Sequence, residues 1–119
     1  MTRCILDYIP PELLSQAYQW RQEYAWSKEA CIQVLQHLQQ QCISILGIEV
    51  WIPSTSGPVI PSPIMYTWTA SSRNKNEDMT AWAARTCASA RDYVRHFQWD
   101  TQDTTCSRYT PYFCIVPDI

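Results

Sequence analysis

Apolar residues recur at helical spacing near the start of the chain. Pro10 and Pro11 suit the first turn of a helix, and the carboxylate of Glu12 favours its positive end. The apolar positions that follow are Leu13, Leu14, Ala17, Tyr18, Trp20 and Tyr24. This spacing predicts a first helix over residues 11–24. The aromatic rings on this predicted helix make its apolar stripe wider than one buried face requires. We therefore expect some of the rings to face a partner.

A second and clearer helical stripe follows Ser27. This serine is placed as an N-cap, Glu29 lies in the first turn, and Trp26 is placed to pack against Cys31. The apolar stripe consists of Cys31, Val34, Leu35, Leu38, Cys42, Ile45 and Leu46. We expect the helix to end at Gly47 in a left-handed conformation, with Cys31 and Cys42 in the core.

The period then changes to two, which is typical of strands. Ile48, Val50 and Ile52 alternate with Glu49 and Trp51, so we expect the two sets on opposite faces of one strand. Residues 53–63 hold four prolines and predict a stiff connector. Residues 64–69 alternate again and predict a second strand, which would pair with the first as a long-looped hairpin.

A third helix is predicted after the polar loop at residues 70–76, with Glu77 and Asp78 as acidic first-turn residues. Its apolar face comprises Met79, Trp82, Ala83, Thr86, Cys87, Ala90, Tyr93, Val94 and Phe97. A polar loop at residues 100–107 and a strand at residues 109–116 follow, and residues 4–8 are a candidate extra strand.

These elements predict one α+β domain over residues 1–119. It would have about three helices packed on a small, mainly antiparallel sheet, in the order α-α-β-β-α-β. A chain of 119 residues is long enough for one sizeable core and too short for two. The hydrophobic fraction of 46%, with 6 Trp and 7 Tyr, supplies the apolar surface that such a core needs.

The charge balance argues against nucleic acid and membrane as partners. The net charge is −2, which gives no general attraction to phosphate backbones. Arg85, Arg91 and Arg95 form a basic stripe, but Asp92 interrupts it, so a solvated helix face is the preferred interpretation. The start of the chain lacks the apolar region of a secretory signal, and no apolar run reaches membrane-spanning length. We therefore expect a cytoplasmic protein.

The cysteines are expected to be small core residues. There are six at irregular spacing: Cys4, Cys31, Cys42, Cys87, Cys106 and Cys114. They form no Cys-x-x-Cys pair and no zinc-ligand spacing with histidine, and thiols stay reduced in the cytosol. No metal and no cofactor are predicted. The even number leaves open a disulfide set in an exported protein.

Catalytic machinery is hard to assemble from this sequence. A thiol-dependent enzyme needs a cysteine beside a histidine, but His37 lies mid-helix and His96 near a helix end, outside any recognisable nucleophile setting. Glu49 is the one carboxylate that shares a strand with apolar neighbours, although an exposed strand face is the preferred interpretation. No catalytic residue is predicted.

The surplus of aromatic residues favours a recognition surface. Trp51, Tyr66, Trp68 and Trp99 lie around predicted strand ends and loops, and Tyr and Trp are the residues that anchor interfaces. Core packing accounts for about half of the tryptophans in a chain of this size. The remainder predicts binding to a protein partner.

The segment LGIEVWIPSTSGPVIPSPIMYTW, residues 46–68, resembles immunity proteins of bacterial polymorphic-toxin and contact-dependent growth inhibition systems. The resemblance implies a non-catalytic protein that neutralises a cognate toxin domain by sitting on or near its active site. Such toxins are often nucleases, whose basic clefts would suit acidic side chains. The residues predicted to bind the toxin are Glu49, Trp51, Trp68, Glu77, Asp78, Trp99, Asp100 and Asp103. A thiol-dependent enzyme with a Cys/His pair and a regulatory protein-interaction adaptor are the alternatives.

Overall fold

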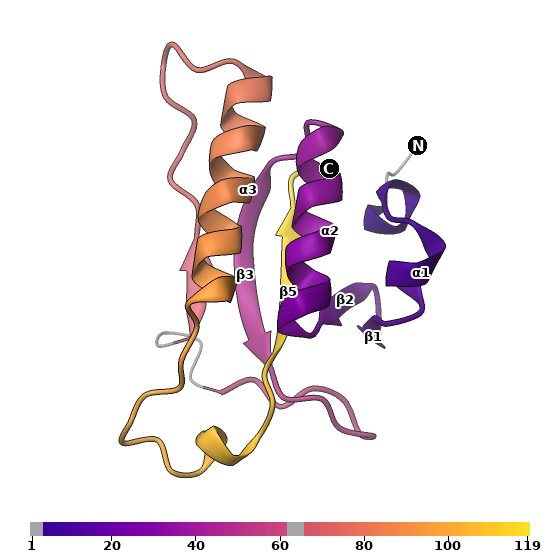
Figure 1. Ribbon diagram of the computed structural model, residues 1–119, viewed down its shortest axis with the longest axis vertical. Coiled ribbons are helices and arrows are strands. Elements are labelled where there is room, and N and C mark those ends of the chain that lie inside the picture. Colours follow the sequence, from indigo (N-terminus) through magenta and orange to yellow (C-terminus); the bar gives the residue numbers. More distant parts are fainter. Residues whose placement is uncertain (1–3, 62–65) are drawn as a thin grey trace.

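The computed structural model describes residues 4–61 and 66–119 and places a layer of helices in front of one sheet (Figure 1). The helices are α1 (Pro11–Leu14), α2 (Lys28–Gln40) and α3 (Met79–Arg95), with short 3-10 helices at Ile5–Tyr8 and Cys106–Arg108. The strands are β1 (Tyr18–Trp20), β2 (Glu23–Trp26), β3 (Ile45–Trp51), β4 (Thr67–Thr69) and β5 (Tyr112–Pro117). The predicted α+β class is confirmed.

The five strands form one antiparallel sheet in the order β1-β2-β5-β3-β4. The predicted hairpin is confirmed as β3 with β4, in which Ile48 lies opposite Trp68. The predicted second strand also covered residues 64 and 65, which lie outside the described residues. The last strand of the chain, β5, lies between β2 and β3 in the middle of the sheet.

The prediction of a helix over residues 11–24 is wrong beyond Leu14. The chain continues as the hairpin of β1 and β2, joined by a two-residue turn in which Arg21 has a φ of 59°. Aromatic side chains at every second position pack well on a pleated sheet but lose rotamer freedom in a helix, which favours the hairpin. The candidate strand at residues 4–8 is also wrong, because Ile5–Tyr8 is a 3-10 helix.

The second helix is confirmed, with Ser27 as its N-cap residue, but it ends at Gln40 and not at Gly47. Cys42 takes the left-handed conformation there, with a φ of 59°. The backbone N–H of Ile43 donates to Leu38 at 2.9 Å and that of Cys42 to Gln39 at 3.0 Å, the pattern of a Schellman cap. Cys42 is therefore exposed, which corrects its expected core position, whereas Cys31 is buried as predicted.

The main core lies between the helices and the inner face of the sheet. It joins Val34, Leu35 and Leu38 of α2 and Cys87, Ala90 and Val94 of α3 to strand residues such as Trp26, Ile48, Val50, Phe113 and Ile115. Two polar contacts fix the layers. The indole N–H of Trp26 donates to Leu13 O at 2.9 Å, and the hydroxyl of Thr86 accepts from Ile45 N at 3.0 Å.

No helix in the described residues is long and apolar enough to cross a membrane.

Candidate functional site

The outer face of the sheet, which points away from the helices, carries a second and smaller core. Ala25, Trp51 and Cys114 are buried there, with Tyr18 and Tyr112 packed against them. Tyr18 meets the Trp51 ring edge-on at 6.0 Å between centroids. No helical residue belongs to this cluster in the described part of the chain. Trp51 is only 1% exposed, so its ring does not face solvent in this structure.

Two carboxylates flank the buried Cys114 on this face. The sheet register places Glu49 directly opposite Cys114, and Glu23 lies two residues before Ala25, the partner of Cys114 on β2. The Glu23 Oε2 atom is 3.6 Å from the Cys114 sulfur. Burial raises the pKa of Glu49, and the nearby Glu23 carboxylate raises it further. Burial, together with both carboxylates, also raises the pKa of the Cys114 thiol.

The proline-rich connector covers one end of the outer face. The Tyr18 hydroxyl donates to Ser54 O at 2.8 Å, and Gly57 lies against the ring of Trp20. Gly57 has a φ of 112°, and a Cβ atom there would come within 2.8 Å of Trp20 Cζ2, so this position requires glycine. The connector thus packs on Tyr18 and Trp20 of β1, at the edge of the outer face.

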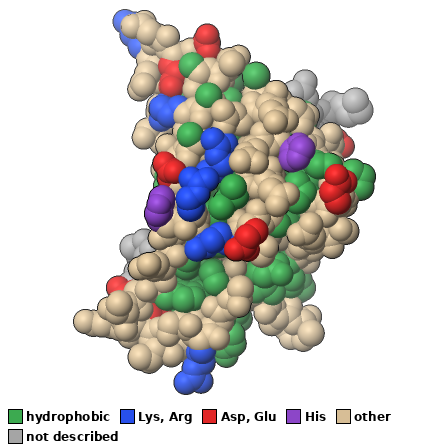
Figure 2. Space-filling view, in the orientation of Figure 1, with side chains coloured by type: hydrophobic (Ala, Val, Ile, Leu, Met, Phe, Trp, Pro, Cys, Tyr) green, Lys and Arg blue, Asp and Glu red, His purple; other side chains and the backbone are tan. Residues whose placement is uncertain are grey.

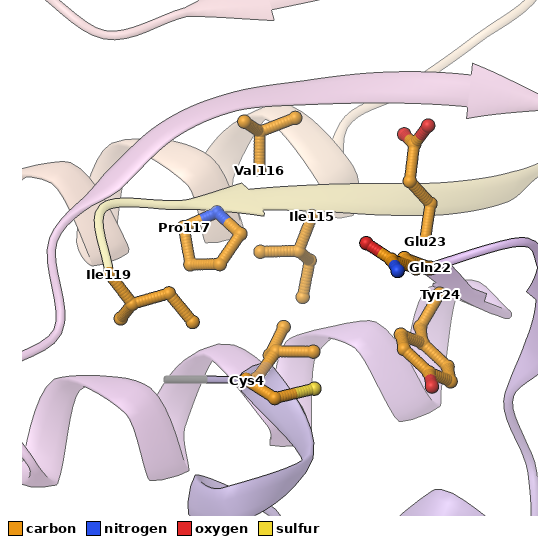
Figure 3. Close-up of a pocket in the computed structure, with 9 residues that line it drawn as sticks. Cys4, Gln22, Glu23, Tyr24, Ile115, Val116, Pro117 and Ile119 are labelled. Atoms are coloured by element: carbon orange, nitrogen blue, oxygen red, sulfur yellow. The ribbon is translucent and has the colours of Figure 1, made fainter. Parts of the chain in front are cut away.

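Two hollows lie beside these carboxylates. The first, of about 550 Å³, opens where β2 and β5 diverge and is shown in Figure 3. In that view the Glu23 carboxylate and the Val116 side chain point away from the hollow, toward the outer face. The second, of about 370 Å³, runs along β3 and β4. It is lined by Leu46, Gly47, Ile48, Glu49, Thr67, Trp68, Thr69 and Val116.

A comparison with protein-family models matches residues 14–117 to the family described as immunity protein 40. The chain belongs to the immunity protein 40 family. Comparisons with curated proteins and with solved structures found no match. The predicted membership of an immunity protein family is therefore confirmed, and the match spans every strand of the sheet.

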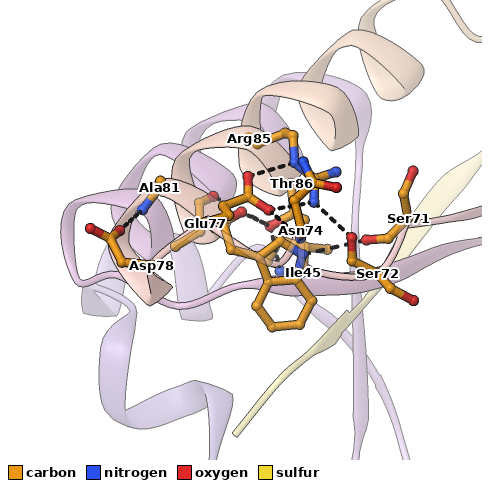
Figure 4. A network of polar contacts seen from close by, with 11 residues as sticks. Ile45, Ser71, Ser72, Asn74, Glu77, Asp78, Ala81, Arg85 and Thr86 are labelled. Atoms are coloured by element: carbon orange, nitrogen blue, oxygen red, sulfur yellow. Dashed lines mark hydrogen bonds and ion pairs between the residues drawn. The ribbon is translucent and has the colours of Figure 1, made fainter.

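In this immunity protein 40 chain, Glu77 and Asp78 organise the start of α3 (Figure 4). The Arg85 side chain donates to both oxygens of Glu77 at 2.8 Å, and this pairing, with the backbone N–H of Asn74, lowers the pKa of Glu77 to about 2. Asp78 is the N-cap residue and accepts from Ala81 N at 2.7 Å. Both carboxylates are already engaged within the chain.

Asp100 and Asp103 lie beyond the opposite end of α3. The Tyr66 hydroxyl donates to Asp103 at 2.9 Å and accepts from Asp100 N at 3.1 Å, which anchors this loop. The backbone N–H of Cys106 and the Tyr66 hydroxyl lower the pKa of Asp103. Because α3 has 17 residues, about 25 Å separates these aspartates from Glu77 and Asp78. The structure therefore does not bring the four acidic residues together.

The two remaining tryptophans of the predicted site are half-buried. Trp68 packs against the main core from the edge strand β4. Trp99 meets Tyr66 and Phe97 edge-on, at centroid distances of 5.0 and 5.1 Å, and its indole donates to Tyr109 O. Both rings support the fold, and neither lies on the outer face beside Glu49.

Basic side chains gather on the helix layer instead, as Figure 2 shows. Arg91 donates to the side chain of Gln39, Lys28 donates to Arg95 O at 3.3 Å, and Arg95 pairs with Asp92 at 3.3 Å. Arg91 and Arg95 of the basic stripe thus make polar contacts within the helix layer, which agrees with a solvated helix face. The outer sheet face carries the Glu23 and Glu49 carboxylates.

The thiols show little of what nucleophilic catalysis requires. All six cysteines are free, and within residues 4–61 and 66–119 no hydrogen bond joins one to His37 or His96. Burial raises the pKa of Cys31, and it raises that of Cys87 to about 11, which disfavours the reactive thiolate. The described residues contain no group of three or more His, Cys, Asp or Glu side chains arranged to hold a metal ion.

Sequence reasoning found Glu49 but missed Glu23, Trp20 and Tyr18 as members of the same surface. These residues lie on the β1–β2 hairpin, which the helical interpretation concealed. The available signal was the alternation of Tyr18 with Trp20 and of Tyr24 with Trp26, interrupted by two polar residues.

Proposed function

We propose that this protein binds a cognate toxin domain and neutralises it without performing chemistry. The observation that carries the proposal is the family match over residues 14–117. The absence of a Cys–His contact within the described residues and the raised thiol pKa values support binding over thiol catalysis. The protein would act as a single domain in the bacterial cytoplasm, where it protects the cell that produces a polymorphic or contact-dependent inhibition toxin.

The toxin is proposed to be a nuclease, because a nuclease presents a basic cleft to its substrate. An acidic surface on the immunity protein would compete for such a cleft and speed the encounter. The outer sheet face supplies such a surface, with Glu23 and Glu49 at its centre.

Co-expression with the toxin domain encoded beside this protein tests the function. Wild-type protein should rescue growth and bind the purified domain, whereas the same plasmid with an early stop codon should not rescue. Failure of the wild-type protein to rescue growth, together with no binding in vitro, would refute the proposal.

Titration of toxin activity distinguishes binding from catalysis. A binding inhibitor should abolish activity at about one equivalent, whereas an enzyme that modifies the toxin would act far below one equivalent. Assays with DNA and RNA substrates test the toxin class. Rescue and binding without any nucleic-acid cleavage would overturn the nuclease proposal while the immunity function stands.

A further inference from the structure

The outer sheet face holds two carboxylates that lack a cation. Within residues 4–61 and 66–119, the ion pairs join Arg85 to Glu77 and Arg95 to Asp92, and neither involves Glu23 or Glu49. The nearest basic residue along the chain, Arg21, places its guanidinium over the Trp20 ring at 5.9 Å. The Glu23 and Glu49 charges therefore repel each other across Cys114, and no ion pair among the described residues offsets this repulsion.

A buried donor at the same place is also unsatisfied. The indole nitrogen of Trp51 is fully buried and has no hydrogen-bond partner of normal geometry among the described residues. Its N–H is near enough to Glu49 to lower the pKa of that carboxylate, which favours the charged form. Among the described residues no cation of this chain pairs with the Glu49 carboxylate that this N–H helps to keep charged, so its oxygens indicate a site for a cation supplied by a partner.

The groove beside Glu49 has the shape and lining for a long side chain. Its floor is largely apolar, from Leu46 and Val116, and Gly47 contributes no side chain that would fill it. Leu46 is 39% exposed, which is unusual for a leucine within a strand. A lysine or arginine side chain could lay its methylene stem along this floor and present its charged head to Glu49.

We propose that the outer face of the sheet docks the toxin domain, and that a lysine or arginine of the toxin occupies this groove with its charged head between Glu23 and Glu49. The inference rests on the proposed function and names the surface that performs it. Charge complementarity supports this face, because Lys28, Arg91 and Arg95 lie on the helix layer and would repel a basic partner there. Glu77, Asp78 and Asp103, at the two ends of α3, already make hydrogen bonds that hold the fold and are not part of this docking site.

The test measures affinity for the purified toxin domain encoded beside this protein. The double variant Glu23→Gln/Glu49→Gln removes both charges and keeps the side-chain shapes. We expect it to bind at least about 30-fold more weakly than wild type, mainly through faster dissociation. Glu29→Gln, an exposed carboxylate on α2, is the matched control and should bind as wild type does. A second variant, Thr69→Arg, should fill the groove and also weaken binding.

The stability of the free protein supplies an independent readout. Because the pKa of Glu49 is raised, its charged form destabilises the fold at neutral pH, so the double variant should unfold at the same or a higher urea concentration than wild type. Weaker binding with undiminished stability would establish a recognition role.

Three outcomes would overturn the proposal. Toxin affinity of the double variant equal to that of wild type would exclude this face while leaving the immunity function intact. A dimer of this chain that the double variant dissociates, with toxin affinity unchanged, would assign the face to a second copy. Wild-type protein that does not bind the toxin domain would refute the proposed function, and this inference with it.

Discussion

Replacement of Cys42 by glycine should stabilise the protein, although cysteine is the native residue. Cys42 has a φ of 59° at the end of α2, a left-handed conformation that a side chain disfavours by about 1–2 kcal/mol. Glycine removes this strain, but it also makes the unfolded chain more flexible, at about 0.4–1 kcal/mol. Little else is lost, because Cys42 is exposed and its sulfur lies 3.7 Å from the hydroxyl of Thr80. The net gain should be about 1 kcal/mol.

Urea unfolding followed by circular dichroism measures this gain. With a slope of about 2 kcal/mol per molar urea, the midpoint of Cys42→Gly should rise by about 0.5 M. Cys42→Ala is the control, because it removes the thiol and keeps the Cβ atom, so its midpoint should stay near that of wild type.

The sign of the change is decisive. If the helix instead continued to Gly47, position 42 would be a helix interior, where glycine costs about 1 kcal/mol relative to alanine. A Cys42→Gly protein less stable than Cys42→Ala would therefore refute the left-handed cap. Gly47→Ala gives the converse test, since its Cβ would lie 3.1 Å from Trp68 O and should destabilise the β3–β4 pairing.

Three further predictions follow from the buried contacts. Thr86→Val should lower the free energy of unfolding by about 1–3 kcal/mol, because Ile45 N loses its buried acceptor; urea unfolding measures the loss. Glu77→Gln should be less stable than wild type at neutral pH, and the difference should shrink as pH falls from about 4.5 to about 2, since Arg85 stabilises only the charged carboxylate; unfolding at several pH values measures this. Thiol titration should find slow reaction in the native protein at Cys31, Cys87 and Cys114, and fast reaction at Cys4 and Cys42.

Each of these has a control or a contrary result. Thr80→Val, an exposed threonine on the same helix, should change stability little. If the difference in unfolding free energy between Glu77→Gln and wild type stayed constant down to pH 2, protonation of Glu77 would not be coupled to folding through the ion pair with Arg85. Rapid labelling of all six thiols without denaturant would contradict the packing of the three buried cysteines.

The helices α2 and α3 and the β3–β4 hairpin could be predicted because their signals are local. Val34, Leu35 and Leu38 lie on one helical face whatever surrounds them, and Ile48 and Val50 alternate with Glu49 in any strand. The same local pattern identified Glu49 as a carboxylate in an unusual setting. The sequence favoured an exposed strand face for this carboxylate, and the structure places it half-buried.

The tertiary structure alone decided which periodicity prevails where the sequence allows two. Tyr18, Trp20 and Tyr24 fit a helical stripe, but they form a hairpin because β2 can pair with β5, which is about 90 residues away in the chain. That pairing also places Glu23 beside Cys114 and near Glu49 on the outer face of the sheet. The Glu23 and Glu49 charges lie on two strands far apart in the sequence and interact only through space, so no local pattern reveals the pair. The candidate binding surface is thus a product of strand order, which depends on long-range burial of apolar side chains and not on the period of any one segment.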